Sequence, residues 1–190
     1  MKTGIFGGSF NPIHNGHIRL ARQMLALSRL DEIWFVVSPQ NPLKRQADLL
    51  DDRQRLDMVR LALTEEPQMT ACDYEFRLPR PSYTWNTLQS MSRDYPDREF
   101  TLLIGGDNWA DFDRWYHHDD ILGNYPIVIY PRGGSQVDAE ALPAGVTLAN
   151  TGLIGISSTE VRRRIRMGLS FDSLVPPVVA NKIIAEHLYF

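Results

Sequence analysis

The opening of the chain combines two glycines with two histidines in a pattern suited to binding phosphate. The segment GGSFNPIHNGH follows directly on a short apolar run. Gly7 and Gly8 allow the backbone to come close to a phosphate, and backbone N–H groups there can point toward its oxygens. His14 and His17 are three residues apart at the start of an amphipathic segment, where imidazole and free backbone N–H groups can bind an anion. A tight glycine turn with an incidental histidine pair is the plainer alternative.

Other chemistries fit this segment less well. Zinc binding stays open for His14 and His17, but the sequence offers no nearby cysteine and no third obvious ligand. The GxxxxGK[ST] phosphate loop is absent, and no GxGxxG dinucleotide fingerprint follows the first apolar run. The favoured interpretation is therefore a phosphate site of a different type.

A second anion site is predicted near the end of the chain, in the segment ISSTEVRRRIRMG. Ser157 and Glu160 have the spacing of a capping box, which predicts that a helix starts here, and Gly168 is a suitable helix end. Arg162 lies four residues after Ser158, hence on the same helix face near its N-terminus. Hydroxyls, free backbone N–H groups and one guanidinium would then bind an anion together. Helix capping alone would explain the serines but not the arginine.

The elements that must position these groups alternate short apolar runs with longer amphipathic segments, as in a parallel sheet flanked by helices. Runs such as IWFVV and FTLLIG are nearly continuous in hydrophobic residues, which is typical of strands buried on both faces. Ligands of open α/β sheets bind beyond the carboxyl ends of the strands, where the glycine turn would lie. We therefore expect an α/β fold: a Rossmann-like, doubly wound parallel sheet with helices on both faces and a small C-terminal helical part.

The expected strands are Thr3–Phe6, Ile33–Ser38, Met69–Cys72, Phe100–Ile104, Ile127–Tyr130 and Val146–Leu148. The expected helices are His17–Ser28, Asp52–Thr64, Thr84–Arg93, Ser158–Met167 and Pro177–His187, with loops at Pro39–Asp48 and Pro131–Gly145.

The composition is that of an ordinary globular protein, with 190 residues, 43% hydrophobic and 23% charged. We expect a single domain over residues 1–190. A net charge of −3 argues against a general nucleic-acid binder, and no apolar run approaches the roughly 20 residues of a membrane span. Cys72 is the only cysteine, which excludes an internal disulfide and a multi-cysteine zinc site. These features favour the reducing cytoplasm. A homo-oligomer is neither indicated nor excluded.

Taken together, GGSFNPIHNGH and ISSTEVR resemble the two signatures of the nucleotidyltransferase superfamily, often written (H/T)xGH and SSTxxR. Three intervening segments resemble one branch, the bacterial nicotinate-nucleotide adenylyltransferases: NPLK at 41–44, PSYTWNTL at 81–88 and IGGDNWADFDRWYHHDDIL at 104–122. Ser9 and Asn11 stand where Thr and Asp are commoner, and Gly106 where alanine is common. The missing carboxylate at Asn11 weakens any metal role for the opening motif.

The resemblance implies that a mononucleotide phosphate attacks the α-phosphorus of ATP in line, giving deamido-NAD and pyrophosphate. The catalytic residues that it implies are His14, His17, Arg162 and Lys44. The ATP-binding residues that it implies are Gly7, Gly8, Ser9, Phe10, His14, His17, Ile156, Ser157, Ser158 and Arg162. The residues implied for nicotinate mononucleotide are Lys44, Thr84, Gly105, Asp107, Asn108, Trp115 and Tyr116. No protein-held metal is expected, because Mg²⁺ usually arrives on the phosphates of ATP.

Among these residues, Asp107 and Asn108 would bind ribose hydroxyls, with a helix cap over Trp109–Phe112 as the alternative. Thr84, Trp115 and Tyr116 would hold the pyridine ring and its carboxylate by stacking and backbone N–H groups. The rival functions are an adenylyltransferase for nicotinamide mononucleotide or phosphopantetheine, and a nucleotide-binding regulatory module without chemistry. A structural or interaction protein would leave the two anion sites unexplained.

Overall fold

The computed structural model describes residues 1–39 and 49–190, and its centre is a sheet of six parallel strands. The strand order is β3-β2-β1-β4-β5-β6, so the chain moves outward in one direction from β1 and then returns to fill the other side. This reversal between β1 and β4 is where ligands bind in open α/β sheets. The strands are β1 (Lys2–Gly8), β2 (Glu32–Val37), β3 (Met69–Cys72), β4 (Glu99–Gly105), β5 (Ile127–Tyr130) and β6 (Val146–Leu148).

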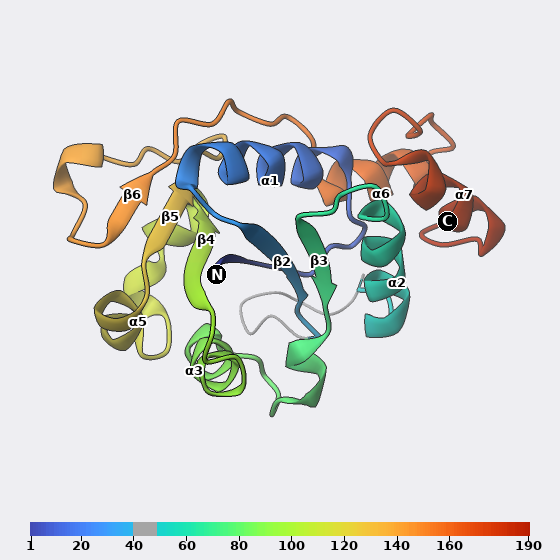
Figure 1. Cartoon of the computed structure of the whole chain (residues 1–190). Helices are drawn as coiled ribbons and strands as arrows, with labels where there is room; N and C mark the ends of the chain where they lie inside the picture. The colour runs from blue at the N-terminus through green and yellow to red at the C-terminus, as the bar shows by residue number, and fades with distance from the viewer. Residues whose placement is uncertain (40–48) are drawn as a thin grey trace.

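Helices cover both faces of the sheet (Figure 1). One buried cluster packs the apolar sides of α1, α2, α6 and α7 against alternate residues of the strands, including Phe6 and Phe35. A second cluster packs α3 and α5 against the other face, including Ile5 and Trp34. The helices are α1 (Asn15–Ser28), α2 (Asp52–Ala62), α3 (Thr84–Asp94), α4 (Gly106–Ala110), α5 (His118–Asn124), α6 (Ser158–Arg166) and α7 (Pro177–Ala185). Single 3-10 turns occur at η1 (Tyr74–Arg77), η2 (Phe112–Arg114) and η3 (Ala139–Ala141).

The expected α/β fold, all six strands and five of the helices are confirmed, with differences of one or two residues at the ends. The expected start of the first helix at His17 is wrong, because α1 begins at Asn15 and His14 is its N-cap. The short helices α4 and α5 were not expected, since five and seven residues are too few for a helical period to stand out. No helix of the described residues has the length and apolar character needed to cross a membrane.

Candidate active site

Two neighbouring hollows lie at the carboxyl edge of the sheet and meet at Gly7, Gly8 and Asn108. The histidine hollow, about 370 Å³, is lined by the glycine turn, the first turn of α1 and the start of α6. The aromatic hollow, about 320 Å³, is lined by the ends of β1, β2 and β4, the start of α3 and the segment from Arg114 to Tyr116. All ten residues implied for ATP line the histidine hollow, namely Gly7, Gly8, Ser9, Phe10, His14, His17, Ile156, Ser157, Ser158 and Arg162.

Two glycines of the opening motif are explained by what surrounds them. A Cβ at Gly7 would meet nothing within 4 Å, so the open space above this turn is available to a ligand. A Cβ at Gly16 would lie 2.8 Å from Ile154 Cγ2 and 2.9 Å from His14 Nδ1. Any side chain at position 16 would therefore force the His14 ring or Ile154 to move away from the start of α1.

The two histidine rings form a stacked pair at the N-terminus of α1. Their centroids are 3.6 Å apart, and the His17 ring also meets Phe10 edge to face at 5.1 Å. The backbone N–H of His14 donates to His17 Nδ1 at 3.2 Å. Because Nδ1 is the acceptor, the proton of the neutral His17 ring is on Nε2. The stack and this hydrogen bond thus fix both the orientation and the tautomer of His17 in the hollow.

His14 is held as a neutral imidazole. Its residue is 4% exposed, and its Nδ1 has no hydrogen-bond partner among the described residues. Burial, together with the nearby charge of Arg132, lowers the pKa of His14 from 6.5 to about 3. A neutral ring can still donate one N–H to a phosphate, while it adds no fixed charge to the hollow.

This buried histidine predicts a specific loss of stability in acid. Below about pH 6.5 the unfolded chain binds a proton at His14 that the native chain does not bind until about pH 3. The free energy of unfolding should therefore decrease as the pH falls through this window, by about 2 kcal/mol at pH 5 from this group. Urea unfolding of the wild type and of His14→Gln from pH 7 to pH 5 measures the effect. If the free energy of unfolding falls equally with pH in the wild type and in His14→Gln, the prediction is wrong.

The helix start expected at Ser157 is present at the start of α6. The hydroxyl of Ser157 accepts from the backbone N–H of Glu160 at 3.1 Å, and Gly168, at φ +64°, ends the helix. Ser158 Oγ donates to the carbonyl of Pro12 at 2.9 Å, and Arg162 Nη1 donates to the carbonyl of Asn11 at 2.7 Å. Both bonds tie α6 to the opening motif, about 150 residues earlier in the chain.

A buried network behind the glycine turn holds these parts in place. Asn11 Oδ1 accepts from the hydroxyl of Tyr189, the penultimate residue, at 2.8 Å. Arg55 of α2 is fully buried, and its guanidinium donates to the carbonyls of Ser9 and Ser38 and to the carboxylate of Asp52. The turn between β1 and α1 is therefore fixed by side chains from α2 and from the C-terminal end.

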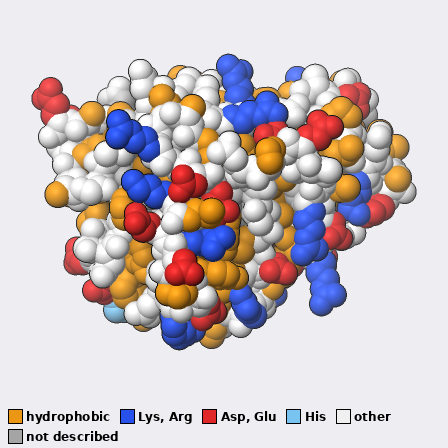
Figure 2. All heavy atoms as spheres, in the orientation of Figure 1, with side chains coloured by type: hydrophobic (Ala, Val, Ile, Leu, Met, Phe, Trp, Pro, Cys, Tyr) orange, Lys and Arg blue, Asp and Glu red, His pale blue; other side chains and the backbone are white. Residues whose placement is uncertain are grey.

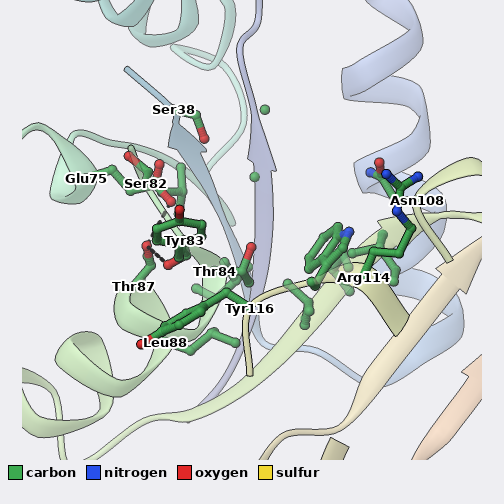
Figure 3. A pocket seen from close by; sticks show the side chains of 18 residues that line it. Ser38, Glu75, Ser82, Tyr83, Thr84, Thr87, Leu88, Asn108, Arg114 and Tyr116 are labelled. Atoms are coloured by element: carbon green, nitrogen blue, oxygen red, sulfur yellow. Dashed lines mark hydrogen bonds between the residues drawn. The ribbon is translucent and has the colours of Figure 1, made fainter. Parts of the chain in front are cut away.

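The aromatic hollow brings together four of the residues implied for the mononucleotide: Thr84, Asn108, Trp115 and Tyr116. Tyr116 packs against Tyr83 with the ring centroids 4.8 Å apart. Figure 3 shows Thr84 and Tyr116 at one end of this hollow. The N-cap of α3 is Tyr83, and no side chain caps the helix, so backbone N–H groups of its first turn are available to an anion.

Of the other residues implied for the mononucleotide, the two that the structure describes do not line this hollow. Gly105 lines neither hollow, and Asp107 lines the histidine hollow, where its carboxylate is 3.5 Å from Arg132 Nε. Lys44 lies outside the described residues. The alternative of a side-chain cap at Asp107 or Asn108 is wrong, because α4 begins at Gly106 with Gly105 as N-cap and no side-chain cap.

Several lining residues were not anticipated from the sequence. Arg132 follows β5 directly and lines the histidine hollow, whereas Glu75, Ser82 and Arg114 line the aromatic hollow. Their positions just beyond the ends of β5 and β3 could have identified Arg132 and Glu75, since side chains at these ends converge on one edge. Among the described residues, no group of three or more His, Cys, Asp or Glu side chains could hold a metal ion.

Basic and acidic side chains are interspersed over the face seen in Figure 2. Within the lining of the histidine hollow, the basic side chains are Arg132 and Arg162, and Arg132 lies beside the carboxylate of Asp107.

Comparison with known proteins agrees with this geometry. A family model described as cytidylyltransferase-like matches residues 5–164. The chain is 46% identical to the probable nicotinate-nucleotide adenylyltransferase of Bacteroides fragilis, over 97% of this chain and 92% of that protein. It is 49% identical to that of Bacteroides thetaiotaomicron, over 87% and 82%. Plasmodium falciparum nicotinic acid mononucleotide adenylyltransferase, complexed with NaAD, shares the fold with a TM-score of 0.83 at 21% identity, over 99% and 97%.

The fold and the family match over residues 5–164 thus define a nucleotidyltransferase of the cytidylyltransferase-like class. Within that class, the identity over nearly the whole chain shows that it belongs to the nicotinate-nucleotide adenylyltransferase family.

Proposed function

We propose that the chain joins ATP to nicotinate mononucleotide, giving deamido-NAD and pyrophosphate in NAD biosynthesis. ATP would occupy the histidine hollow and the mononucleotide the aromatic hollow. The observation that carries this assignment is the meeting of the two hollows at Gly7, Gly8 and Asn108. There the 5′-phosphate of one substrate can approach the α-phosphate of the other. We further propose that the protein acts in the cytoplasm.

The reaction needs positioning and charge stabilisation more than covalent chemistry. A phosphate oxygen of the mononucleotide attacks the α-phosphorus, and the bond from that phosphorus to the β-phosphate oxygen breaks. His17 Nε2–H would donate to the phosphates at the N-terminus of α1. Arg162 and the start of α6 would hold the β- and γ-phosphates, which gain negative charge as pyrophosphate leaves. Mg²⁺ would enter as part of the substrate MgATP.

In the aromatic hollow, Trp115 would stack on the pyridinium ring, because an indole face attracts a flat cation. The uncapped N-terminus of α3, at Thr84, would bind the nicotinate carboxylate through backbone N–H groups. Asn108, at the junction, would bind the ribose or the phosphate. Lys44, which lies outside the described residues, would add a cation for the phosphates.

Pyrophosphate release from MgATP tests the proposal, with nicotinate mononucleotide, nicotinamide mononucleotide and phosphopantetheine supplied separately. We expect strong preference for the nicotinate substrate. Release with only one of the other acceptors would retain the chemistry and refute the substrate. Stabilisation by ATP in a thermal shift, with no release from any acceptor, would favour the regulatory module.

A further inference from the structure

Glu75 is a buried acid in the wall of the aromatic hollow that the proposed roles leave unused. It lies in η1, just beyond the carboxyl end of β3, and is 6% exposed. Its Oε1 accepts from Thr87 Oγ1 at 2.9 Å, whereas its Oε2 is buried without a hydrogen-bond partner among the described residues. The hydroxyl of Ser82, 8% exposed, is buried and unpartnered in the same wall. Figure 3 shows Glu75, Ser82 and Thr87 on one side of the hollow, opposite Asn108 and Arg114.

Two unpartnered polar atoms in one cavity wall point to a ligand group that binds them. A buried polar group without a partner is costly, and such groups are rare in native structures. The hydroxyls of Ser38 and Thr87 also face Glu75, whereas Val36 and Leu88 make other parts of the nearby wall apolar. A substrate entering this hollow can supply the missing hydrogen bonds.

Most of the side chains that face Glu75 from the neighbouring helices and strands are neutral. They are Ser38 beyond β2, Cys72 at the end of β3, and Ser82 and Thr87 at the start of α3. Arg77, in the same turn, lies over the Tyr74 ring, and Arg114 lies across the hollow. Within residues 1–39 and 49–190, no ion pair joins Glu75 to a cation.

Burial without a nearby cation raises the pKa of Glu75, against the opposing effect of the neighbouring hydroxyls of Ser38, Thr87 and Ser82. The charge of Glu75 matters for substrate choice, because nicotinate carries a carboxylate where nicotinamide carries a neutral amide. A carboxylic acid can donate to an anion, whereas a carboxylate repels it and accepts from an amide N–H.

We propose that Glu75, with Ser82, is a specificity-determining subsite for the charge of the pyridine substrate. In its acid form Glu75 donates from Oε2 to an anionic group of nicotinate mononucleotide, and in its carboxylate form it disfavours that substrate relative to the amide. This rests on the proposed function, since it concerns the same hollow and the same reaction.

The test is the ratio of kcat/KM for nicotinate mononucleotide to kcat/KM for nicotinamide mononucleotide, measured as a function of pH. Both substrates carry the same phosphate and meet the same catalytic groups, so the titration of shared groups cancels in the ratio. We expect the wild-type ratio to fall at least about tenfold as the pH rises from mildly acidic to alkaline, because loss of the proton from the buried Glu75 removes the donor.

Glu75→Gln separates this effect from other titrations. Its amide keeps a donor without a charge, so the ratio should stay near the low-pH wild-type value at every pH. Glu99→Gln, an exposed acid at the start of β4 outside both hollows, is the matched control and should follow the wild-type curve.

Two results would overturn the inference alone. One is a wild-type ratio that does not change with pH, which needs no variant to observe. The other is a Glu75→Gln ratio that falls in parallel with the wild type. Absence of turnover with both substrates at every pH would instead overturn the proposed function and this inference with it.

Discussion

Replacing His17 by alanine is expected to lower kcat for pyrophosphate release by about 10²- to 10³-fold, the usual cost of losing one donor to a transition-state oxyanion. His17 lines the histidine hollow, and the hydrogen bond to its Nδ1 leaves Nε2 as the donor. The phosphates gain charge during the reaction, so this donor should contribute more in the transition state than in the ground state. The loss should therefore appear mainly in kcat, with a smaller change in the KM for ATP.

His118→Ala is the matched control for this variant. His118 is the first residue of α5 and lines neither hollow, so its removal should leave kcat within about twofold, as for most surface substitutions. Steady-state kinetics and a thermal shift with ATP measure both variants. A loss of less than tenfold in kcat for His17→Ala, with normal folding, would contradict the assignment of His17 as a transition-state donor.

The strands could be predicted from local sequence, because buried parallel strands are continuous apolar runs. The carboxyl edge of the sheet could be predicted as the place of the site, because the glycine turn follows the first of these runs. The helix start at α6 could be predicted for the same reason: Ser157, Glu160 and Gly168 carry their capping signals within twelve residues. The histidine spacing also predicted that His14 and His17 would lie together at the edge of the sheet, and both line the histidine hollow. It did not reveal that His14 would be the N-cap of α1 and be buried.

The supports of the site could not be predicted, because their partners are distant in the sequence. Asn11 meets Tyr189 across 178 residues and Arg162 across 151. In the sequence, Arg55 cannot be distinguished from an exposed helix arginine. In the fold it is buried under the ends of β1 and β2. The position of Glu75 just beyond β3 indicates the edge of the sheet, but nothing local in the sequence indicates that its side chain is buried. Such side chains can be recognised only in the folded structure, where packing excludes water from them.

The network also explains how the two signatures, far apart in sequence, are held side by side. The carbonyls of Asn11 and Pro12 accept from Arg162 and Ser158. The turn of the opening motif therefore orients α6, and both elements are proposed to bind the phosphates of ATP. A substitution in either signature is therefore expected to affect both, and single effects should not add.

Replacing Arg162 by alanine is expected to lower kcat/KM for ATP by about 10²- to 10³-fold. Its Nη1 donates to the carbonyl of Asn11, while its Nε is buried without a partner among the described residues. Arg162 also lines the histidine hollow. The guanidinium can thus hold the turn and a phosphate oxygen at once, which a single ammonium cannot reproduce. Arg162→Lys should therefore recover only part of the loss.

Arg163→Ala, on the next position of the same helix, is the matched control for Arg162→Ala. Arg163 is exposed and pairs with Glu160, and a solvent-exposed ion pair of this kind contributes little to stability. It lines neither hollow, so pyrophosphate release should remain within about twofold of the wild type. Equal losses in the two variants would show that α6 needs its overall positive charge. A loss confined to Arg162 would show that one placed guanidinium, oriented by the opening turn, carries the interaction with the leaving pyrophosphate.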